Sequence, residues 1–144
     1  MWRALIRQAD NYLLSRYPPE ACYLEDVSAL AKPNVTLLGA FDGETLVGTG
    51  AFKILRDGDS RYGEVKRLFV TAEARGGGLG RQLMEALEAR LRAEGIHTVR
   101  LETGAQQPEA VYLYRALGYR VRGPFSDYLE SEHSIFMEKH LNNK

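Results

Sequence analysis

The sequence has one cysteine, Cys22, in 144 residues. A single cysteine can form neither an internal disulfide nor a cysteine-based metal cluster, which favours a reducing, cytoplasmic setting. The three histidines, His97, His133 and His140, are scattered without the spacing of metal ligands. We therefore expect neither a disulfide framework nor a metal site.

Net charge and long apolar runs are missing as well. The 19 Lys and Arg residues balance the 19 Asp and Glu residues, so no overall field attracts phosphate backbones, and we expect no nucleic-acid partner. No apolar run approaches the roughly 18–20 residues that a membrane span requires, and the N-terminus lacks a secretory hydrophobic stretch. The length and the 44% hydrophobic content instead predict one soluble, cytoplasmic domain over residues 1–144, without membrane contact.

What the sequence does contain is a hydrophobic period that changes along the chain. Helices are predicted over 3–16, 20–31 and 108–117, and where Leu79, Leu83, Leu87 and Leu91 recur before Gly95. Strands are predicted over 35–41, 45–54, 62–70, 97–103, 119–122 and 134–140, with a turn at Asp42-Gly43 and a polar loop over 56–60. Hairpins imply antiparallel pairing and strand–helix–strand units imply crossovers, so the predicted fold is α/β, with helices packed on a mixed sheet.

A glycine-rich segment, Arg75-Gly76-Gly77-Gly78-Leu79-Gly80-Arg81, lies between a predicted strand and the leucine-rich helix. Successive glycines let backbone N–H groups approach a ligand closely, and the start of a helix favours negative charge. The segment matches neither the Walker pattern, because Gly80 is followed by Arg81-Gln82, nor the dinucleotide fingerprint. It is either a cradle for a pyrophosphate or a flexible turn from strand to helix.

Two segments together resemble the GNAT superfamily of N-acetyltransferases. Residues 70–80, Val-Thr-Ala-Glu-Ala-Arg-Gly-Gly-Gly-Leu-Gly, are similar to its Arg/Gln-x-x-Gly-x-Gly/Ala signature, and residues 107–119 are similar to its second marker, with Gln107 where Asn is common. The resemblance covers roughly residues 35–140. It implies a mixed, mostly antiparallel central sheet flanked by helices. Because the chain begins in a predicted helix, the first strand of that fold is expected to be missing.

The resemblance also implies an activity and a cofactor site. The activity is transfer of an acetyl group from acetyl-CoA to a primary amine of a small molecule or peptide. Because Cys22 lies far from both motifs, we expect direct attack without an acetylated enzyme. By the same resemblance, the backbone of Leu68, Phe69 and Val70 binds the pantetheine arm, and Arg75, Gly76, Gly77, Gly78, Leu79, Gly80 and Arg81 hold the pyrophosphate. Gln107 either reaches the cofactor or caps its own helix.

Two residues are candidates for the proton transfers that such a reaction needs. Glu64, on the strand before the glycine-rich segment, is the candidate base; the alternative is a solvated glutamate on an edge strand. Tyr114 is the candidate acid, because the resemblance matches it to the tyrosine that protonates the leaving sulfur. The alternative for Tyr114 is a core aromatic residue, and Tyr112 is expected to point to a different face.

Other features keep two interpretations. Lys66 either binds a substrate carboxylate or belongs to a solvated strand face, and Phe125 and Tyr128 either form part of the acceptor pocket or pack on the surface. A different class of protein, a non-catalytic acyl-CoA-binding sensor, would keep the glycine-rich segment but need neither Glu64 nor Tyr114. The late strands offer a surface for pairing in a homodimer.

Overall fold

The computed structural model describes residues 34–142. The helices predicted over 3–16 and 20–31, the expected absence of a first strand and the position of Cys22 all lie outside the described residues. The described residues form six strands and two α-helices. A short 3-10 helix, η3 (Ala72–Ala74), lies between the third strand and the first of these two α-helices. The strands are β1 (Val35–Asp42), β2 (Thr45–Asp57), β3 (Ser60–Val70), β4 (Thr98–Gly104), β5 (Arg120–Arg122) and β6 (Ser134–His140).

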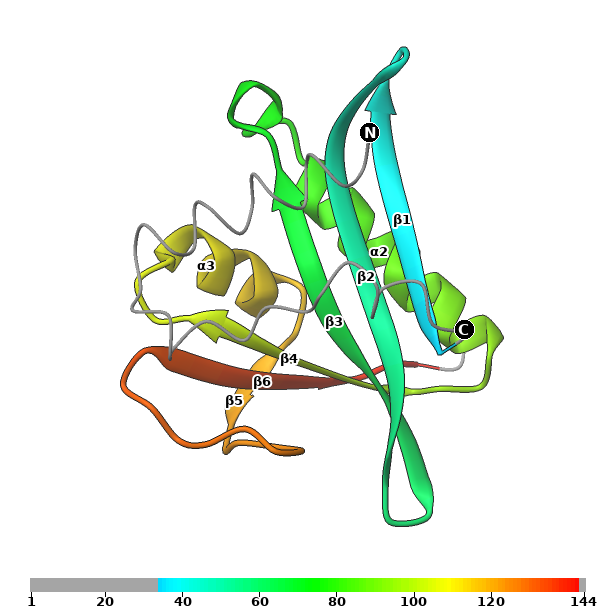
Figure 1. The fold of residues 1–144 in the computed structure, drawn as a ribbon, viewed down its shortest axis with the longest axis vertical. Helices are drawn as coiled ribbons and strands as arrows, with labels where there is room; N and C mark the ends of the chain where they lie inside the picture. The colour runs from blue at the N-terminus through cyan, green and yellow to red at the C-terminus, as the bar shows by residue number, and fades with distance from the viewer. Residues whose placement is uncertain (1–33, 143–144) are drawn as a thin grey trace.

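These strands form one sheet in the order β1-β2-β3-β4-β6-β5 (Figure 1). The β3–β4 pair is parallel, and the other neighbouring pairs are antiparallel. The parallel pair requires a crossover, which is α2 (Leu79–Ala93), and α3 (Pro108–Ala116) connects β4 to β5. The predicted mixed, mostly antiparallel sheet with helices packed on it is therefore confirmed for the described residues.

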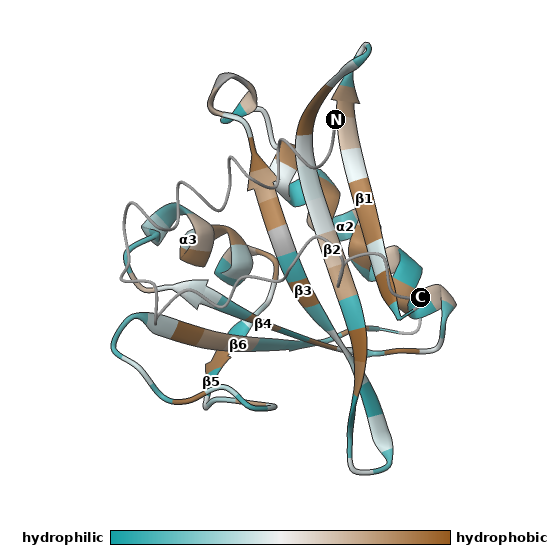
Figure 2. Ribbon diagram, in the orientation of Figure 1, coloured by the Kyte–Doolittle hydropathy of each residue, from teal (hydrophilic) through white to brown (hydrophobic). Residues whose placement is uncertain are grey.

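One predicted loop is wrong. The polar residues over 56–60 were expected to separate two strands, but β2 and β3 continue through them as a ladder, and Asp57 pairs with Ser60. Gly58 has φ +63° and makes the turn together with Asp59. Polar residues here reflect the solvated end of a long hairpin, which Figure 2 shows as mainly hydrophilic at the bottom of the view.

The leucine-rich helix α2 covers one face of the sheet (Figure 1). Its side chains Leu83, Met84, Leu87 and Leu91 are buried, and Gly95 ends it with φ +77°, as the sequence predicts. Met84, Leu87 and Leu91 pack in a core cluster with strand residues such as Val65, Val99, Leu101 and Met137, and with Tyr114 of α3. Because neighbouring strand residues point to opposite faces, Phe136 and Tyr62 lie on the other face, in a smaller cluster with Phe125.

The two middle strands separate partway along their length. The β3–β4 ladder joins Gly63, Glu64 and Val65 to Val99, Arg100 and Leu101, and pairing stops there. Across β2, Thr49 faces Phe69 while Ala51 faces Lys66, so β3 contains one extra residue, a β-bulge, directly after the last β4 pair. A bulge bends its strand. In Figure 1 the free ends of β3 and β4 diverge, which opens the sheet between them.

The fit between β3 and α2 provides a test of the core. A Cβ on Gly63 would lie 2.7 Å from both Cδ atoms of Leu91, which is fully buried. We expect Gly63→Ala to lower the free energy of unfolding by about 1–3 kcal/mol, because the core must shift to admit the methyl group. Gly123→Ala is the matched control, since nothing lies within 4 Å of its Cβ position. Equal denaturation midpoints for the two variants would contradict this packing.

Candidate functional site

A cavity of about 660 Å³ opens where β3 and β4 stop pairing. Its walls come from the end of β3, the turn and first residues of α2, the end of β4, α3, and Tyr128 in the loop after β5. Because β3 has lost its β4 partner here, the backbone edge of this strand is presented to the cavity instead of to a neighbouring strand. The interruption of the sheet is what creates the site.

The glycine-rich segment forms one end of this cavity. Gly76 has φ +88° and Gly78 has φ +81°, a region that other residues rarely adopt, and Gly78 is the N-cap of α2. The first N–H groups of a helix have no partner inside the helix, and no acidic residue lies in the first turn of α2. Arg75 and Arg81 also line the cavity. This end therefore offers backbone donors and positive charge to an anion.

The structure brings together almost all the predicted site residues. Twelve of them line the cavity: Glu64, Leu68, Phe69, Val70, Arg75, Gly76, Gly78, Leu79, Gly80, Arg81, Gln107 and Tyr114. Gly77 is the predicted residue that does not line it. Gln107 occupies the N-cap position of α3, but its side chain makes no capping hydrogen bond. The interpretation that this side chain caps its own helix is therefore wrong.

Arg75 is anchored within the loop. Its Nε donates a hydrogen bond of 3.0 Å to the carbonyl oxygen of Val70, and its guanidinium carbon lies 5.5 Å from the centre of the Phe69 ring. These contacts fix the arginine at the junction between the end of β3 and the glycine-rich segment. A held guanidinium loses less conformational entropy when it meets an anion than a freely rotating side chain does.

Glu64 lies at the other end of the cavity and is 3% exposed on a central strand. The alternative of a solvated glutamate on an edge strand is therefore wrong. The Tyr128 hydroxyl donates a hydrogen bond to Glu64 Oε2, and the Lys66 Nζ lies 3.3 Å from the same oxygen. Lys66 also donates to the Tyr128 hydroxyl at 3.0 Å. Lys66 and Tyr128 both line the cavity, so neither is merely a surface residue.

Tyr114 belongs both to the core and to the cavity. It is 6% exposed, and its ring packs edge-on against Tyr119 at 5.9 Å. Burial raises the pKa of the Tyr114 hydroxyl well above its ordinary value, and the negative charge of Glu102 raises it further. The hydroxyl therefore keeps its proton at any ordinary pH. Tyr112, by contrast, is 77% exposed and points away, as expected.

Sequence reasoning missed Glu102 on β4. It lines the cavity and accepts a hydrogen bond of 2.8 Å from the Ser134 hydroxyl on β6. Burial raises the pKa of Glu102, and the nearby Glu64 charge adds to this, while Ser134 and Lys66 oppose it. Alternation along β4 already placed this residue on the face opposite Val99 and Leu101. Its closeness to Glu64 depends on the parallel pairing of β3 with β4, which the alternation does not reveal.

The described site thus combines an anion-binding end with two carboxylates and one protonated phenol. Within residues 34–142, no group of three or more His, Cys, Asp or Glu residues is arranged to hold a metal ion. No described helix is long and apolar enough to cross a membrane. The chemistry that these groups support is binding of a phosphorylated ligand next to side chains that accept and donate protons.

Comparison with known proteins agrees with this geometry. The model of the acetyltransferase (GNAT) family matches residues 2–119. The chain therefore belongs to the acetyltransferase (GNAT) family, as the two sequence markers indicated.

Individual relatives extend this result. The chain is 46% identical over 137 residues to a protein named IAA acetyltransferase from Azospirillum brasilense, covering 95% of this chain and 88% of that protein. It is 33% identical to an uncharacterised N-acetyltransferase, YsnE, of Bacillus subtilis, covering 86% and 82% of the two chains. A crystal structure of a candidate acyl-CoA N-acyltransferase from Klebsiella pneumoniae matches with a TM-score of 0.80 and 36% identity, covering 96% and 88%.

The raised pKa of Glu102 leads to a prediction about stability. A carboxyl group whose folded pKa lies above its unfolded pKa stabilises the fold at low pH, and this contribution is lost as the pH rises through the folded pKa. Glu102→Gln has no carboxyl group to ionise, so it does not lose this stability as the pH rises. Its side-chain oxygen can still accept the Ser134 hydrogen bond. We therefore expect the melting temperature of Glu102→Gln to rise relative to that of the wild type as the pH increases.

The control is Glu130→Gln, which removes one charge from an exposed loop residue. Melting temperatures of both variants and the wild type are measured across the acid-to-neutral range. A constant difference between Glu102→Gln and the wild type at every pH would contradict the burial of a charged Glu102.

Proposed function

We propose that this protein transfers an acetyl group from acetyl-CoA to a primary amine of a small molecule or peptide, by direct attack of the amine on the thioester. The observation that carries the proposal is a single cavity that joins the start of α2 to Glu64 and Tyr114. One end suits a diphosphate and the other holds groups for proton transfer. The separated ends of β3 and β4 provide the passage between them.

In this proposal the cofactor lies along residues that the cavity brings together. The first N–H groups of α2, with Gly76, Gly78 and Arg81, hold the pyrophosphate, and the free backbone edge at Leu68–Val70 binds the pantetheine arm. Support comes from a structural neighbour, the PaiA N-acetyltransferase of Thermoplasma acidophilum in complex with coenzyme A, with a TM-score of 0.64 and 25% identity. That comparison covers 74% of this chain and 61% of the other.

The acceptor must lose a proton before it can attack, because an alkyl ammonium has a pKa of about 10.4. Glu64 is the proposed base, acting directly or through a water molecule. It already shares its Oε2 with Tyr128 and Lys66, so the hydroxyl and ammonium fix the carboxylate and partly neutralise it. Glu102 is the other carboxylate at this end, and burial raises its pKa.

Tyr114 is the proposed acid that gives a proton to the leaving sulfur. The residue is buried beside the cavity, and its raised pKa keeps the hydroxyl protonated until a strongly basic group forms nearby. In the same buried site the departing thiolate also loses its water, which raises the pKa of its thiol, so the sulfur accepts a hydrogen bond and then the proton from the hydroxyl as the carbon–sulfur bond breaks.

The experiment that tests the activity is a screen of amines with the purified full chain and acetyl-CoA, measuring free thiol release. The panel contains polyamines, amino acids, aminoglycosides and short peptides. Thiol release that requires one class of amine supports the proposal. Saturable binding of CoA without thiol release across the panel would instead assign the chain to the non-catalytic acyl-CoA-binding sensors.

Gly78 tests the cofactor end. Asp and Asn have nearly the same shape and both tolerate positive φ, so Gly78→Asp and Gly78→Asn differ mainly in one negative charge. If Gly78 lies beside a pyrophosphate, we expect Gly78→Asp to bind coenzyme A about tenfold or more weakly than Gly78→Asn. Isothermal titration calorimetry measures both affinities. Equal affinities would place the diphosphate elsewhere.

Tyr114→Phe tests the acid. The substitution keeps the ring that packs against Tyr119 and removes the hydroxyl. We expect kcat to fall by roughly 10²–10⁴-fold, with little change in the affinity for coenzyme A. Tyr112→Phe, at an exposed position, serves as the control and should leave kcat unchanged. An unaltered kcat for Tyr114→Phe at every pH would remove this residue from the proposed mechanism.

A further inference from the structure

A hydroxyl and an ammonium meet the same oxygen of Glu64 in the candidate functional site. The Tyr128 hydroxyl donates a hydrogen bond to Glu64 Oε2, and Lys66 Nζ lies 3.3 Å from that atom. Within the described residues, the polar contacts of this carboxylate are all made at Oε2. Because Glu64 lines the cavity, its other oxygen, Oε1, is left for a group that enters there.

A second buried glutamate, Glu88 on α2, is arranged differently. Like Glu64 it is 3% exposed, and it too has a tyrosine and a lysine as partners. The Tyr119 hydroxyl donates to Glu88 Oε2 at 2.8 Å, but Lys139 Nζ donates to the other oxygen, Oε1, at 2.9 Å. Both oxygens of Glu88 therefore have a donor, and none of these three partners lines the candidate functional site.

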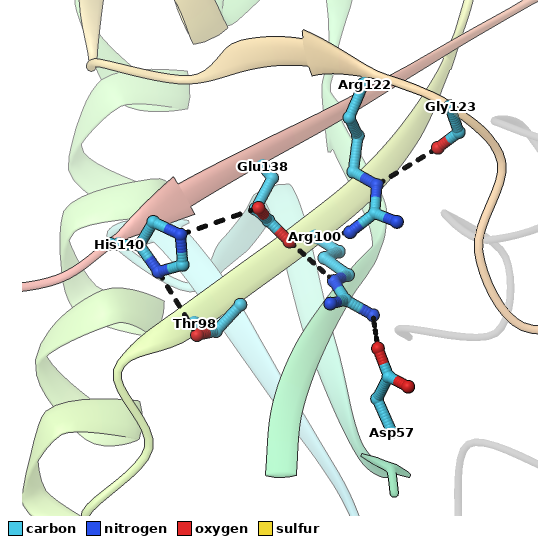
Figure 3. Close-up of polar contacts among 7 residues, drawn as sticks. All are labelled: Asp57, Thr98, Arg100, Arg122, Gly123, Glu138 and His140. Carbon is cyan, nitrogen blue, oxygen red and sulfur yellow. Dashed lines mark hydrogen bonds and ion pairs between the residues drawn. The ribbon is translucent and has the colours of Figure 1, made fainter. Parts of the chain in front are cut away.

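Glu138 on β6 also has partners at both oxygens. Arg100 Nε and Arg122 Nη1 each donate a hydrogen bond of 2.7 Å to Oε1, and His140 Nε2 lies 3.5 Å from Oε2 (Figure 3). A carboxylate accepts hydrogen bonds at each of its two oxygens, so this is the ordinary way to satisfy a carboxylate inside a protein.

The two glutamates that line the cavity depart from this pattern. Glu64 and Glu102 each have their described partners at Oε2, and no described donor meets Oε1 of either residue. A buried oxygen without a donor is costly, so a ligand or water in the cavity is the expected partner. The ammonium of an acceptor can donate such a hydrogen bond and then transfer the same proton.

Lys66 sets the direction of the Tyr128 hydroxyl. Lys66 Nζ lies 3.0 Å from the hydroxyl oxygen, and an ammonium can only donate hydrogen bonds. The hydroxyl therefore accepts from Lys66 and points its own hydrogen at Glu64. With two groups held against Oε2, the carboxylate of Glu64 is fixed about its last rotatable bond.

The turn before Tyr128 holds the ring of this residue in place. The Tyr128 N–H donates to the carbonyl oxygen of Phe125 at 3.2 Å, and the Tyr128 ring lies 5.2 Å from the Phe125 ring and 5.5 Å from the Phe136 ring. Both phenylalanines are buried. Ser126, within the turn, has φ +56°, which residues other than glycine rarely adopt. Such backbone persists where its surroundings hold it, and it is typical of functional sites.

We propose that Tyr128 and Lys66 are positioning residues that hold Glu64 at Oε2 and thereby direct Oε1 to the acceptor amine. The proposal rests on the acetyl transfer proposed above. The acceptor ammonium gives its proton to Oε1: the O–H bond forms as the N–H bond breaks, and the electron pair stays on nitrogen, which then attacks the thioester. Without the hydroxyl the carboxylate turns away from this orientation, and proton transfer slows.

The test follows Tyr128→Phe, which keeps the ring and removes the hydroxyl. Its kcat/KM is measured with the panel amine that gives the fastest thiol release, from neutral pH to about pH 10. At neutral pH we expect kcat/KM to fall roughly 10–100-fold. The deficit should shrink as the pH nears the amine pKa of about 10.4, because a free amine needs no base. The other titratable groups near Glu64, which are Glu102 and Tyr62, are unchanged.

The Glu88 cluster supplies matched controls. Tyr119→Phe removes the same kind of buried hydroxyl–carboxylate bond and should match the wild type at every pH. Lys66→Met and Lys139→Met form a second pair that leaves the loop and its rings intact, and only Lys66→Met should show the deficit that shrinks with pH. Melting temperatures and affinities for coenzyme A show whether the fold and the cofactor end are intact in each variant.

The outcomes separate the two proposals. If the wild type releases no thiol with any amine, the acetyl transfer is wrong and the positioning role falls with it. If the wild type is active, three results would overturn the positioning role alone: an unchanged kcat/KM for Tyr128→Phe, a deficit that is the same at every pH, or equal deficits within either matched pair.

Discussion

The site depends on the interruption of pairing between two neighbouring strands. β3 and β4 pair over three residues on each side and then separate after Val65 and Leu101. A backbone edge inside a sheet must find other partners or contact solvent, since unpaired N–H and C=O groups are costly to bury. The β-bulge in β3 makes the separation possible because the extra residue bends the strand away from β4. The cavity, the exposed backbone edge and the access to the start of α2 all follow from this one break.

The two ends of the cavity use different kinds of physical chemistry. At the start of α2, the features that suit an anion are those of the backbone: Gly76 and Gly78 adopt positive φ, and the helix offers its uncapped N–H groups. At the other end, the character of each group depends on burial. Tyr114 and Glu102 have raised pKa values because the protein removes water from around them. The first end suits a fixed anion, and the second suits groups that exchange protons.

The face of the sheet away from α2 carries charged side chains over a long distance. Glu64 and Lys66 line the candidate functional site, while Arg100 and Arg122 pair with Glu138, and Arg100 also pairs with Asp57 of the β2–β3 hairpin. Between them are the aromatic rings of Tyr62, Phe125, Tyr128 and Phe136, which pack against one another edge-on or tilted. These rings lie between the two groups of charged side chains.

The sequence determined the element types of the described residues, the glycine-rich turn before α2 and the family, because these depend on local features: hydrophobic period, turn residues and short motifs. It also made two residues candidates for proton transfer: Glu64, from its place on the strand before the glycine-rich segment, and Tyr114, from the second marker. It failed at the 56–60 hairpin, where polarity indicated a loop although the backbone continued to pair. It also left open whether Gln107 capped its helix.

Only the tertiary structure decided which residues meet. Glu102 joins Glu64 because β4 pairs in parallel with β3, and Tyr128 reaches Glu64 from a loop 64 positions further along the chain. Likewise, Arg100 and Arg122 converge on Glu138 from two other strands, and no spacing in the sequence links these three residues. Local patterns act over a few residues, whereas strand order, register and burial arise when the whole sheet assembles, and these set the environment of every charged group.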